Sequence, residues 1–499
     1  MTRESTTAPP PDEALRDEGP LARMALRFTA FTEKWLPDAF GFVLVGTVLI
    51  FLLGLAWGES IFGLSTTEPP KAPAGMGLVD AWGAGFWSLI IFTLQMAMII
   101  IGGYAVATSP PMARLIDKLA GIPTGPRSAV AFVAAVSMLA SYLNWAFSLV
   151  FAAILAKEVA RRNPEADYRA LGAMAFIGLG TVWAQGFSGS AALQVASAAS
   201  SPPAVQDEIR KFGFESGTIP LDGTILNWRA VAATLLVFVV AVVTAWLIAP
   251  KAHSGKNAEE MGVTLRPLLG EGSEVAQRRA ESRPRRPGDQ LEYSPVMTIL
   301  ICLIGFVWVV RAFSGKNFFA TLDLNMINLI LLLLAMLLRW HPISMVKSVV
   351  DGSRAAAGVL LQFPFYGGIF GMIAYTGLSH KIADVLTSIS TQFFYPALIA
   401  FYSMILGVFV PSGGSKWVIE APYVLDAAHQ LGVDAGWMVV VYDLGEASAN
   451  LLQPFWMLPT LAILGLKAKD IMGYTFTMFL ACFPTALIAV TFLAPHLGR

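Results

Sequence analysis

Long hydrophobic stretches separated by short polar segments run along most of the chain. A helix that crosses the hydrocarbon core of a bilayer needs about 20 predominantly apolar residues. The hydrophobic residues form continuous runs rather than an alternating pattern, which favours helices over strands. We expect an all-α polytopic membrane protein with about nine transmembrane helices. The predicted spans are 40–58, 82–106, 170–198, 229–249, 294–313, 324–340, 352–377, 436–466 and 471–494.

Two further hydrophobic stretches, 128–157 and 395–428, are too long for one ordinary span and carry polar residues near their centres. The first has Asn144 at its centre, and the second has the polar sequence from Ser412 to Lys416. Unpaired backbone groups and a charge cannot face lipid without a large cost in free energy. Each polar centre is therefore expected to be buried in protein or to line a wet cavity.

Basic residues flank the first of these stretches on both sides, at positions 114–127 and 157–169. Because cytoplasmic loops carry an excess of lysine and arginine, both flanks are expected in the cytoplasm. The stretch then enters and leaves the bilayer from one side, as a re-entrant hairpin. The same reasoning places the N-terminus in the cytoplasm and the C-terminus in the periplasm, with the second stretch as a hairpin from the opposite face. The expected location is the lipid bilayer of the inner membrane.

Charge and hydropathy divide the chain into four parts. Residues 1–34 are predicted to be a disordered cytoplasmic tail, and residues 251–293 form a very basic loop, expected in the cytoplasm. The transmembrane halves are 35–250 and 294–499, and each contains one hairpin. Both halves have the order span, amphipathic segment, hairpin, interrupted span and span, in opposite orientations. This order predicts an inverted repeat, which is typical of secondary transporters whose broken helices meet near the bilayer midplane.

Composition supports a membrane protein and narrows the functional classes. The 499 residues are 56% hydrophobic and 14% charged, with a formal net charge of zero, whereas soluble domains carry about 25% charged residues. A neutral chain argues against a nucleic-acid partner. Cys302 and Cys482 lie in hydrophobic runs, the five histidines lie in or near predicted loops, and no phosphate-binding loop is present. We expect no enzymatic activity and no cofactor.

Each half also contains an interrupted span, at 185–190 and at 450–454, so four polar breaks occur in matching positions. Helix N-termini at a break favour anions, and free carbonyls favour cations. Glycines and serines can instead serve only close helix packing, but four matched breaks favour a binding site. We expect this site to take a small carboxylate, with Na⁺ as the possible metal near Asn144, Ser412 and Asn450. The predicted substrate-binding residues are Asn144, Ser188, Gly189, Ser190, Ser412, Gly413, Gly414, Ser415, Lys416 and Asn450.

Four ionisable residues lie at membrane depth, where such groups are functional candidates. On a helix, Lys416 and Glu420 are four residues apart and can pair. Asp443 and Glu446 are three residues apart and share one face. Two interpretations stay open: a salt bridge that ties the second hairpin to the next span, and a direct role in coupling to H⁺ or Na⁺. The predicted ion-coupling residues are Asp443, Glu446 and Glu420.

Three motifs in the second half carry a family resemblance. They are Val410-Pro411-Ser412-Gly413-Gly414 followed by Trp417, Gly445-Glu446-Ala447 followed by Asn450-Leu451, and Pro454-Phe455-Trp456. These motifs resemble those of the short-chain fatty acid transporter family, the AtoE-like permeases. The resemblance covers nearly the whole chain outside the tail and the central loop. The resemblance implies uptake of short monocarboxylates such as acetoacetate or butyrate. It also implies kinship with the ion-transporter superfamily, whose paired hairpins hold substrate and coupling ion.

The chain departs from the family pattern at two places. A glycine and a glutamine follow the two tip glycines in the family, where this chain has Ser415-Lys416. A glutamine-glycine pair stands in the family where this chain has Glu420-Ala421. Lys416 then either neutralises a substrate carboxylate or replaces a bound sodium ion. The alternatives to uptake are an exporter or antiporter of another small carboxylate and, less favoured, an anion channel. Related hairpin folds also suggest a homodimer.

Overall fold

The computed structural model describes residues 39–63, 76–251, 255–269, 289–314, 321–409 and 412–495. The predicted tail at 1–34, much of the loop 251–293 and residues 410–411 before the second tip lie outside the described residues. The described part of the chain is built from helices and contains no strand, which confirms the expected all-α fold.

Six of the described helices are long and apolar enough to cross a membrane. They lie within α5 (Ile90–Ala107), α7 (Pro126–Leu143), α12 (Trp228–Ile248), α15 (Pro295–Phe313), α18 (Pro342–Ala374) and α24 (Ala468–Phe492). Shorter apolar helices lie within α3 (Ala39–Ala56), α17 (Leu324–Arg339) and α20 (Tyr395–Phe409), and at Phe455–Leu464. Except for α7 and α20, these helices overlap predicted spans. The number of membrane crossings stays a prediction.

The other helices are mostly shorter and include both interrupted spans. In the first half they are α4 (Leu78–Phe86), α6 (Pro110–Leu119), α8 (Trp145–Arg162), α9 (Tyr168–Phe176), η1 (Trp183–Gln185), α10 (Ser190–Val195), α11 (Pro203–Arg210) and η2 (Leu221–Gly223). After these come α14 (Asp289–Glu292), α19 (Leu378–Ser388), α21 (Gly413–Leu431), α22 (Ala435–Ala449), η3 (Phe455–Met457) and α23 (Leu458–Leu464). The amphipathic segments of the two halves are α6 and α19.

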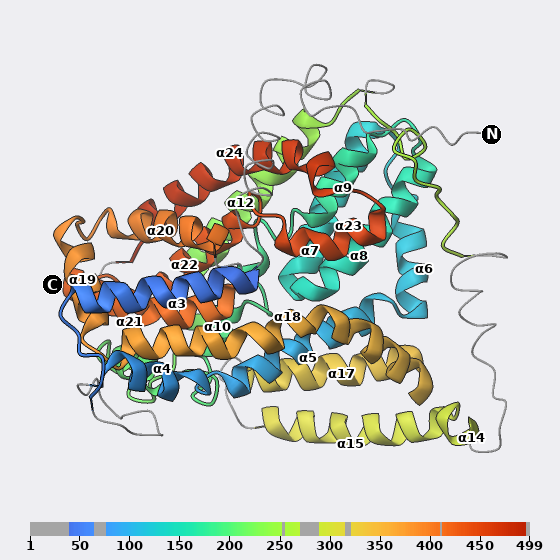
Figure 1. Cartoon of the computed structure of the whole chain (residues 1–499). Helices are drawn as coiled ribbons and strands as arrows, with labels where there is room; N and C mark the ends of the chain where they lie inside the picture. Colours follow the sequence, from blue (N-terminus) through green and yellow to red (C-terminus); the bar gives the residue numbers. More distant parts are fainter. Residues whose placement is uncertain are drawn as a thin grey trace, which may run out of the picture.

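The two predicted hairpins are helix pairs with different degrees of closure. Helices α7 and α8 pack side by side and are joined by Asn144 alone (Figure 1). Helix α20 packs chiefly along α22, whereas α21 packs on α18, α19 and α22. The second hairpin is therefore more open than the first. The sides from which the hairpins enter a bilayer, and the inverted repeat, stay predictions.

The structure differs from the expected elements in two places. The predicted span 82–106 is split into α4 and α5, because the Ser88 hydroxyl and amide both donate to the Gly85 carbonyl at the end of α4. The first interruption is also longer than 185–190, since regular helix is absent between α9 and η1. Gly178 packs so tightly on α7 that a Cβ there would lie 2.6 Å from the Ser137 carbonyl oxygen.

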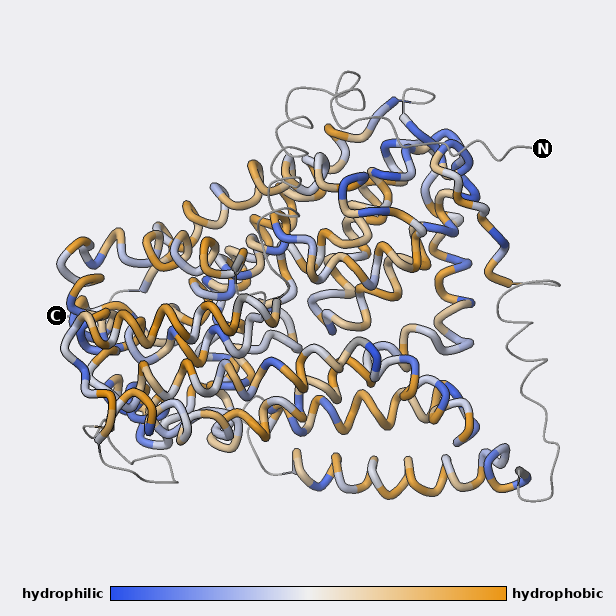
Figure 2. The backbone as a smooth tube through the Cα atoms, viewed as in Figure 1, coloured by the Kyte–Doolittle hydropathy of each residue, from blue (hydrophilic) through white to orange (hydrophobic). Residues whose placement is uncertain are grey.

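Helices α21 and α22 run through the interior of the protein. Every residue from Gly413 to Ala428 and every residue of α22 is buried, whereas α15 lies at the edge with 11% of its span buried (Figure 1). Figure 2 shows hydrophobic residues along α3, α12 and α15, with hydrophilic residues collected near the ends of the molecule. The polar part of the second hairpin is thus enclosed by protein.

Candidate functional site

Hydrogen bonds join the first hairpin tip to the first interrupted span, and that span to the second interrupted span. The Trp145 amide donates to Ser188 Oγ at 2.9 Å, which ties the first tip to the first break. Asn450 Nδ2 donates to the Leu179 carbonyl at 3.1 Å, which ties the second break to the first. Polar segments that are far apart in the sequence therefore meet in one region.

The first tip is a tight turn at Asn144, which ends α7 and begins α8. Its backbone is extended (φ −159°, ψ 122°), and its Oδ1 accepts a hydrogen bond from the Phe147 amide at 2.8 Å as a helix N-cap. The Phe187 amide donates to the Tyr142 carbonyl at 2.8 Å, so the first break runs beside this tip. Gly103 of α5 makes room for the tip, since a Cβ there would lie 2.7 Å from Asn144 Oδ1.

The second tip begins α21 at Gly413 with no side-chain cap among the described residues. Ser412 precedes the helix with φ −150° and ψ 97°, and the first turn holds no acidic residue. A Cβ on Gly413 would lie 2.7 Å from the Trp183 ring, and a Cβ on Gly414 would lie 2.1 Å from the Phe92 ring. The uncapped N-terminus carries partial positive charge, which favours an anion.

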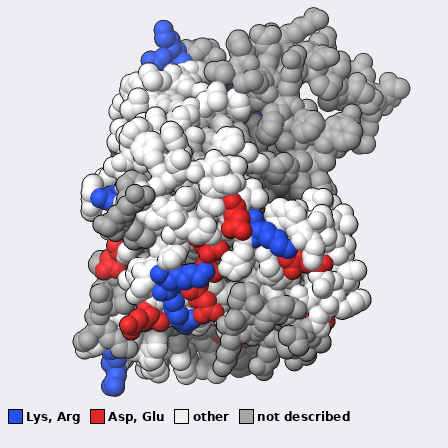
Figure 3. Space-filling model, turned by 90° about the vertical axis from the view of Figure 1, so that its left-hand side faces the viewer, with Lys and Arg blue, Asp and Glu red and all other residues white. Residues whose placement is uncertain are grey.

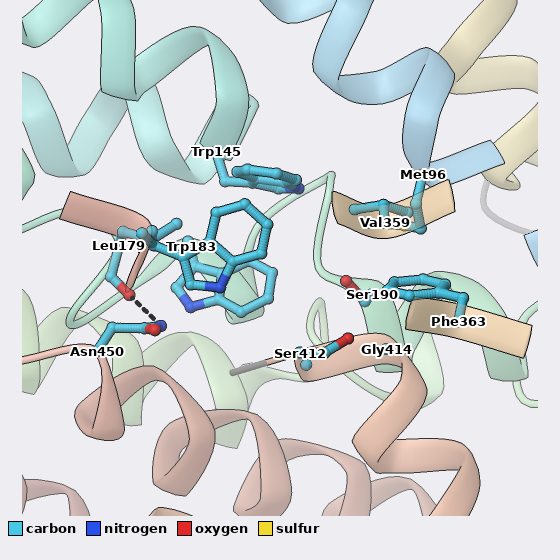
Figure 4. Close-up of a pocket in the computed structure, with 12 residues that line it drawn as sticks. Met96, Trp145, Leu179, Trp183, Ser190, Val359, Phe363, Ser412, Gly414 and Asn450 are labelled. Carbon is cyan, nitrogen blue, oxygen red and sulfur yellow. Dashed lines mark hydrogen bonds between the residues drawn. The ribbon is translucent and has the colours of Figure 1, made fainter. Parts of the chain in front are cut away.

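A small pocket lies between the two tips and the two breaks (Figure 4). The figure shows the Trp145 and Trp183 rings across from Met96 and Val359. The centre of a water molecule can occupy about 20 Å³ of this pocket. This volume has room for about one water molecule. Its lining residues are mainly apolar. They are Met96, Trp145, Leu179, Trp183, Ser190, Val359, Phe363, Ser412, Gly413, Gly414, Asn450 and Trp456.

Two indole donors that line the pocket, Nε1 of Trp145 and Nε1 of Trp183, have no hydrogen-bond partner among the described residues. The two residues are 4% and 6% exposed. A buried donor without an acceptor costs about 1–3 kcal/mol, so a polar group of a ligand stabilises this arrangement. Since the described lining holds no charged side chain, a carboxylate in this pocket meets neutral donors.

Lys416 lies in a closed cluster of ionisable groups behind the second tip. Its side chain is fully buried, and its Nζ lies 3.0 Å from Glu420 Oε1 and 2.8 Å from Glu446 Oε2. Ser403 Oγ donates to the second oxygen of Glu420 at 2.5 Å. The expected pairing of Lys416 with Glu420 is present, and the pair with Glu446 ties α21 to α22.

Asp443 faces the first interrupted span from α22. Gln185 Nε2 lies 3.4 Å from Asp443 Oδ2 and donates to the Val440 carbonyl at 3.3 Å. With all groups ionised, the carboxylates of Glu420, Asp443 and Glu446 and one ammonium carry a charge of 1 − 3 = −2. Excess charge in a buried cluster is costly, so bound protons or a cation would stabilise it.

Ion pairs hold the far end of α21. Asp426 lies 2.8 Å from His380 Nδ1 of α19 and 3.2 Å from Lys211 Nζ next to α11. Lys211 also pairs with Glu208 at 2.7 Å. Burial raises the pKa of the Glu208 carboxyl, although Lys211 acts in the opposite direction. Figure 3 shows basic and acidic side chains gathered on the end of the molecule where α19 lies.

The structure brings half of the predicted substrate-binding residues to the pocket and places the others beside it. The lining residues are Ser190, Ser412, Gly413, Gly414 and Asn450. The residues outside the lining are Asn144, Ser188, Gly189, Ser415 and Lys416. Sodium near Asn144, Ser412 and Asn450 stays a prediction, and the Oδ1 atoms of both asparagines already accept hydrogen bonds.

The residues that the sequence reasoning missed are mainly aromatic. Trp183 lies two residues before the first predicted interruption and Trp456 two residues after the second, and both line the pocket. A tryptophan close to a polar break is the available signal. Met96 and Phe363 come from the interiors of α5 and α18. Nothing in their local sequence distinguishes them from ordinary span residues.

Comparison with known proteins agrees with this arrangement over most of the chain. The family model described as short chain fatty acid transporter matches residues 20–493. A protein of Escherichia coli (strain K12) is 34% identical over 92% of this chain and 97% of its own length. A protein of Haemophilus influenzae is 32% identical over 95% of this chain and 100% of its own length. Both relatives are described as candidate short-chain fatty acid transporters.

Two solved transporter structures share the fold. The YdaH transporter of Alcanivorax borkumensis aligns with a TM-score of 0.57 and 16% identity, over 92% of this chain and 100% of its own. MtrF of Neisseria gonorrhoeae aligns with a TM-score of 0.51 and 15% identity, over 94% of this chain and 96% of its own. The whole-length match of the family model and the identity to the two relatives lead to one conclusion: this chain belongs to the short-chain fatty acid transporter family.

Proposed function

We propose that this protein is a secondary transporter that carries short monocarboxylates, such as acetoacetate or butyrate, across the inner membrane. The observation that carries the proposal is the pocket, an apolar space with neutral donors where both tips and both breaks meet. A short acyl chain suits the apolar wall, and a carboxylate suits the donors. The descriptions of the family and of the two relatives support the same substrate class.

We place the carboxylate at the uncapped start of α21. The amides of Gly413 and Gly414 belong to the first turn of this helix, where anions are favoured. The Trp183 ring packs against Gly413 and brings an indole N–H to the same edge of the pocket. Ser190 and Ser412 add two hydroxyl donors. Together these groups recognise a carboxylate without a fixed positive charge.

The opposite wall of the pocket limits the acyl chain. It consists of Met96, Val359 and Phe363, and Phe363 stacks on Phe92 with ring centroids 5.7 Å apart. The pocket of about 20 Å³ has to widen before even a four-carbon acid fits. We infer that the tip of α21 moves to admit the substrate, which agrees with alternating access in transporters built from broken helices.

Trp183→Phe is expected to raise the KM for butyrate about tenfold, because it removes one N–H donor to the carboxylate and keeps an aromatic ring. The maximal rate is expected to change less, since an aromatic ring is retained in this part of the pocket lining. Uptake of labelled butyrate into proteoliposomes over a range of concentrations measures both quantities.

The matched control is Trp87→Phe, because Trp87 is 63% exposed and is not a pocket-lining residue. This variant should retain the KM of the unmodified protein. An unchanged KM in Trp183→Phe would contradict the placement of the carboxylate beside this indole.

Coupling to H⁺ or Na⁺ is proposed from the balance of buried charge. The carboxyl groups of Glu420, Asp443 and Glu446 exceed the single Lys416 ammonium in number, and all four side chains are buried. Protons on these groups, or a cation beside them, lower the cost of burial. Because Glu446 pairs with Lys416 of the tip helix, ion binding here is linked to the position of the tip.

Glu446→Gln is expected to abolish accumulation of substrate driven by a proton gradient, because the side chain no longer titrates. Exchange of labelled for unlabelled substrate should continue, since the pocket lining is unchanged. Uptake into proteoliposomes with an imposed pH gradient, compared with exchange at equal pH, separates the two processes. Asp426→Asn, at the far end of α21, is the control and should keep the response. Full pH-dependent uptake by Glu446→Gln would contradict a coupling role.

A second candidate is an exporter or antiporter of another small carboxylate metabolite. It is favoured by the shared fold with MtrF, which is described within a class of antimetabolite efflux pumps. Transport of a panel of labelled acids in vesicles of both orientations gives substrate and direction. Counterflow separates a carrier from an anion channel, since only a carrier shows accelerated exchange.

We also propose a homodimer with cytoplasmic N-termini and periplasmic C-termini, testable by cross-linking and by labelling of the termini.

A further inference from the structure

The ammonium group of Lys416 is enclosed by three oxygen atoms and an aromatic ring. Its Nζ lies 2.7 Å from the Ser403 carbonyl, 3.0 Å from Glu420 Oε1 and 2.8 Å from Glu446 Oε2. The Tyr442 ring centroid lies 4.4 Å away. The ammonium donates hydrogen bonds to the Ser403 carbonyl and to Glu420 Oε1, and it forms an ion pair with Glu446 Oε2. Lys416 is 0% exposed.

These contacts have the chemistry of a cation site. Two carboxylates and a carbonyl are hard oxygen ligands, which small hard cations prefer, and an aromatic face also attracts positive charge. The oxygens come from three helices: Ser403 from α20, Glu420 from α21 and Glu446 from α22. A cation at this position therefore holds the tip helix to both neighbouring helices.

The same contacts argue against a direct role of Lys416 in neutralising the substrate. The residue is not among those that line the pocket, and a turn toward the pocket would break its pairs with Glu420 and Glu446. Breaking a buried ion pair leaves an uncompensated charge, which is strongly unfavourable. The neutral donors at the start of α21 remain as the groups that face a carboxylate.

We propose that Lys416 is a tethered cation that fills the position of a bound small monovalent cation such as Na⁺. Transport then requires no sodium, and removal of the lysine side chain creates a site for a free monovalent cation. The charge is conserved, because one ammonium is exchanged for one Na⁺. This inference rests on the proposed transport function and removes sodium from the two candidate coupling ions, which leaves the proton.

The test compares the unmodified protein with Lys416→Ala in proteoliposomes at fixed pH, in sodium chloride and in choline chloride. Uptake by the unmodified protein should be equal in the two salts. Lys416→Ala should transport about tenfold faster in sodium, because sodium restores the charge between Glu420 and Glu446. Its Tm in detergent should rise with sodium concentration, whereas that of the unmodified protein should not. Methylammonium, which supplies the missing group, should also raise the Tm of the variant.

Two controls separate the cation site from loss of a lysine in general. Lys381→Ala removes a half-exposed lysine that pairs with Glu59 at 2.6 Å, and it should gain no sodium response. The double variant Lys416→Ala, Glu446→Gln removes one positive and one negative charge together. It should respond to sodium much less than Lys416→Ala. It also provides a second protein to study if the single variant is not produced in the membrane.

The inference is overturned if uptake by the unmodified protein depends saturably on sodium, or if Lys416→Ala transports equally in both salts. An equal sodium response of the double and single variants would also overturn it. A failure of the proposed function would look different, because the unmodified protein would then transport no short monocarboxylate in either salt. The sodium response of Tm remains measurable in that case and still decides whether Lys416 occupies a cation site.

Discussion

Gly414→Ala is expected to reduce carboxylate uptake about 10- to 100-fold while the protein still inserts into the membrane. A Cβ at this position would lie 2.1 Å from Phe92 Cζ and 3.0 Å from Ser190 Cβ. Phe92 cannot easily turn away, because it is 1% exposed and stacks on Phe363. The start of α21 must therefore shift, and overpacking of this kind costs about 1–3 kcal/mol. Initial uptake rates per amount of inserted protein measure the effect.

Gly83→Ala is the matched control, because it makes the same change in helix α4 where a Cβ meets no atom within 4 Å. Its uptake should equal that of the unmodified protein. Adding Phe92→Leu to Gly414→Ala should restore part of the activity, since the smaller side chain relieves the contact. Normal uptake by Gly414→Ala would show that the tip position is not critical for transport.

Gly445→Ala is expected to destabilise the folded protein by about 3 kcal/mol, the upper end of the usual range for overpacking. The new Cβ would lie 2.3 Å from the Ala400 carbonyl oxygen and 3.0 Å from Ala400 C and Cα. These are backbone atoms of α20, which cannot change rotamer to make room. Helices α20 and α22 would have to separate along their contact. Thermal unfolding in detergent should show a clearly lower Tm.

Gly358→Ala in α18 serves as the control for stability. A Cβ there would lie 3.8 Å from Gln362 Nε2 and 4.0 Å from a ring carbon of Phe455, which are ordinary contacts. Alanine favours a helix over glycine by about 1 kcal/mol, so this variant should keep or slightly raise the Tm. Equal Tm values for Gly445→Ala and Gly358→Ala would contradict the close approach of α20 and α22.

Much of the fold follows from local properties of the chain. A run of about 20 apolar residues predicts a helix that can cross a bilayer, and each of the nine predicted spans overlaps at least one helix in the structure. Asn144 and Asn450 are predicted breaks, because polar groups in a long apolar run cannot face lipid. In the structure, Asn144 separates α7 from α8, and Asn450 directly follows α22. Chain length, hydropathy and backbone chemistry are sufficient for these predictions, because each depends on neighbouring residues.

The pocket depends on contacts between distant segments. The walls contributed by Met96 and Phe363 come from spans that look ordinary in the sequence. The lengthened first break likewise reflects the packing of Gly178 on Ser137 of α7. Periodicity shows which residues lie on one helix face, but not which face of another helix lies opposite.

Lys416 shows most clearly what the sequence determines and what depends on the tertiary fold. Its spacing from Glu420 already predicted an ion pair, because residues four apart are neighbours on a helix. Sequence alone left open whether its charge meets the substrate or other groups of the protein. The folded chain answers this by bringing the Ser403 carbonyl of α20 and Glu446 of α22 within 2.8 Å of the ammonium. The sequence determines which residues are charged and how far apart they lie on a helix. The partners that enclose a charge depend on how separate helices pack.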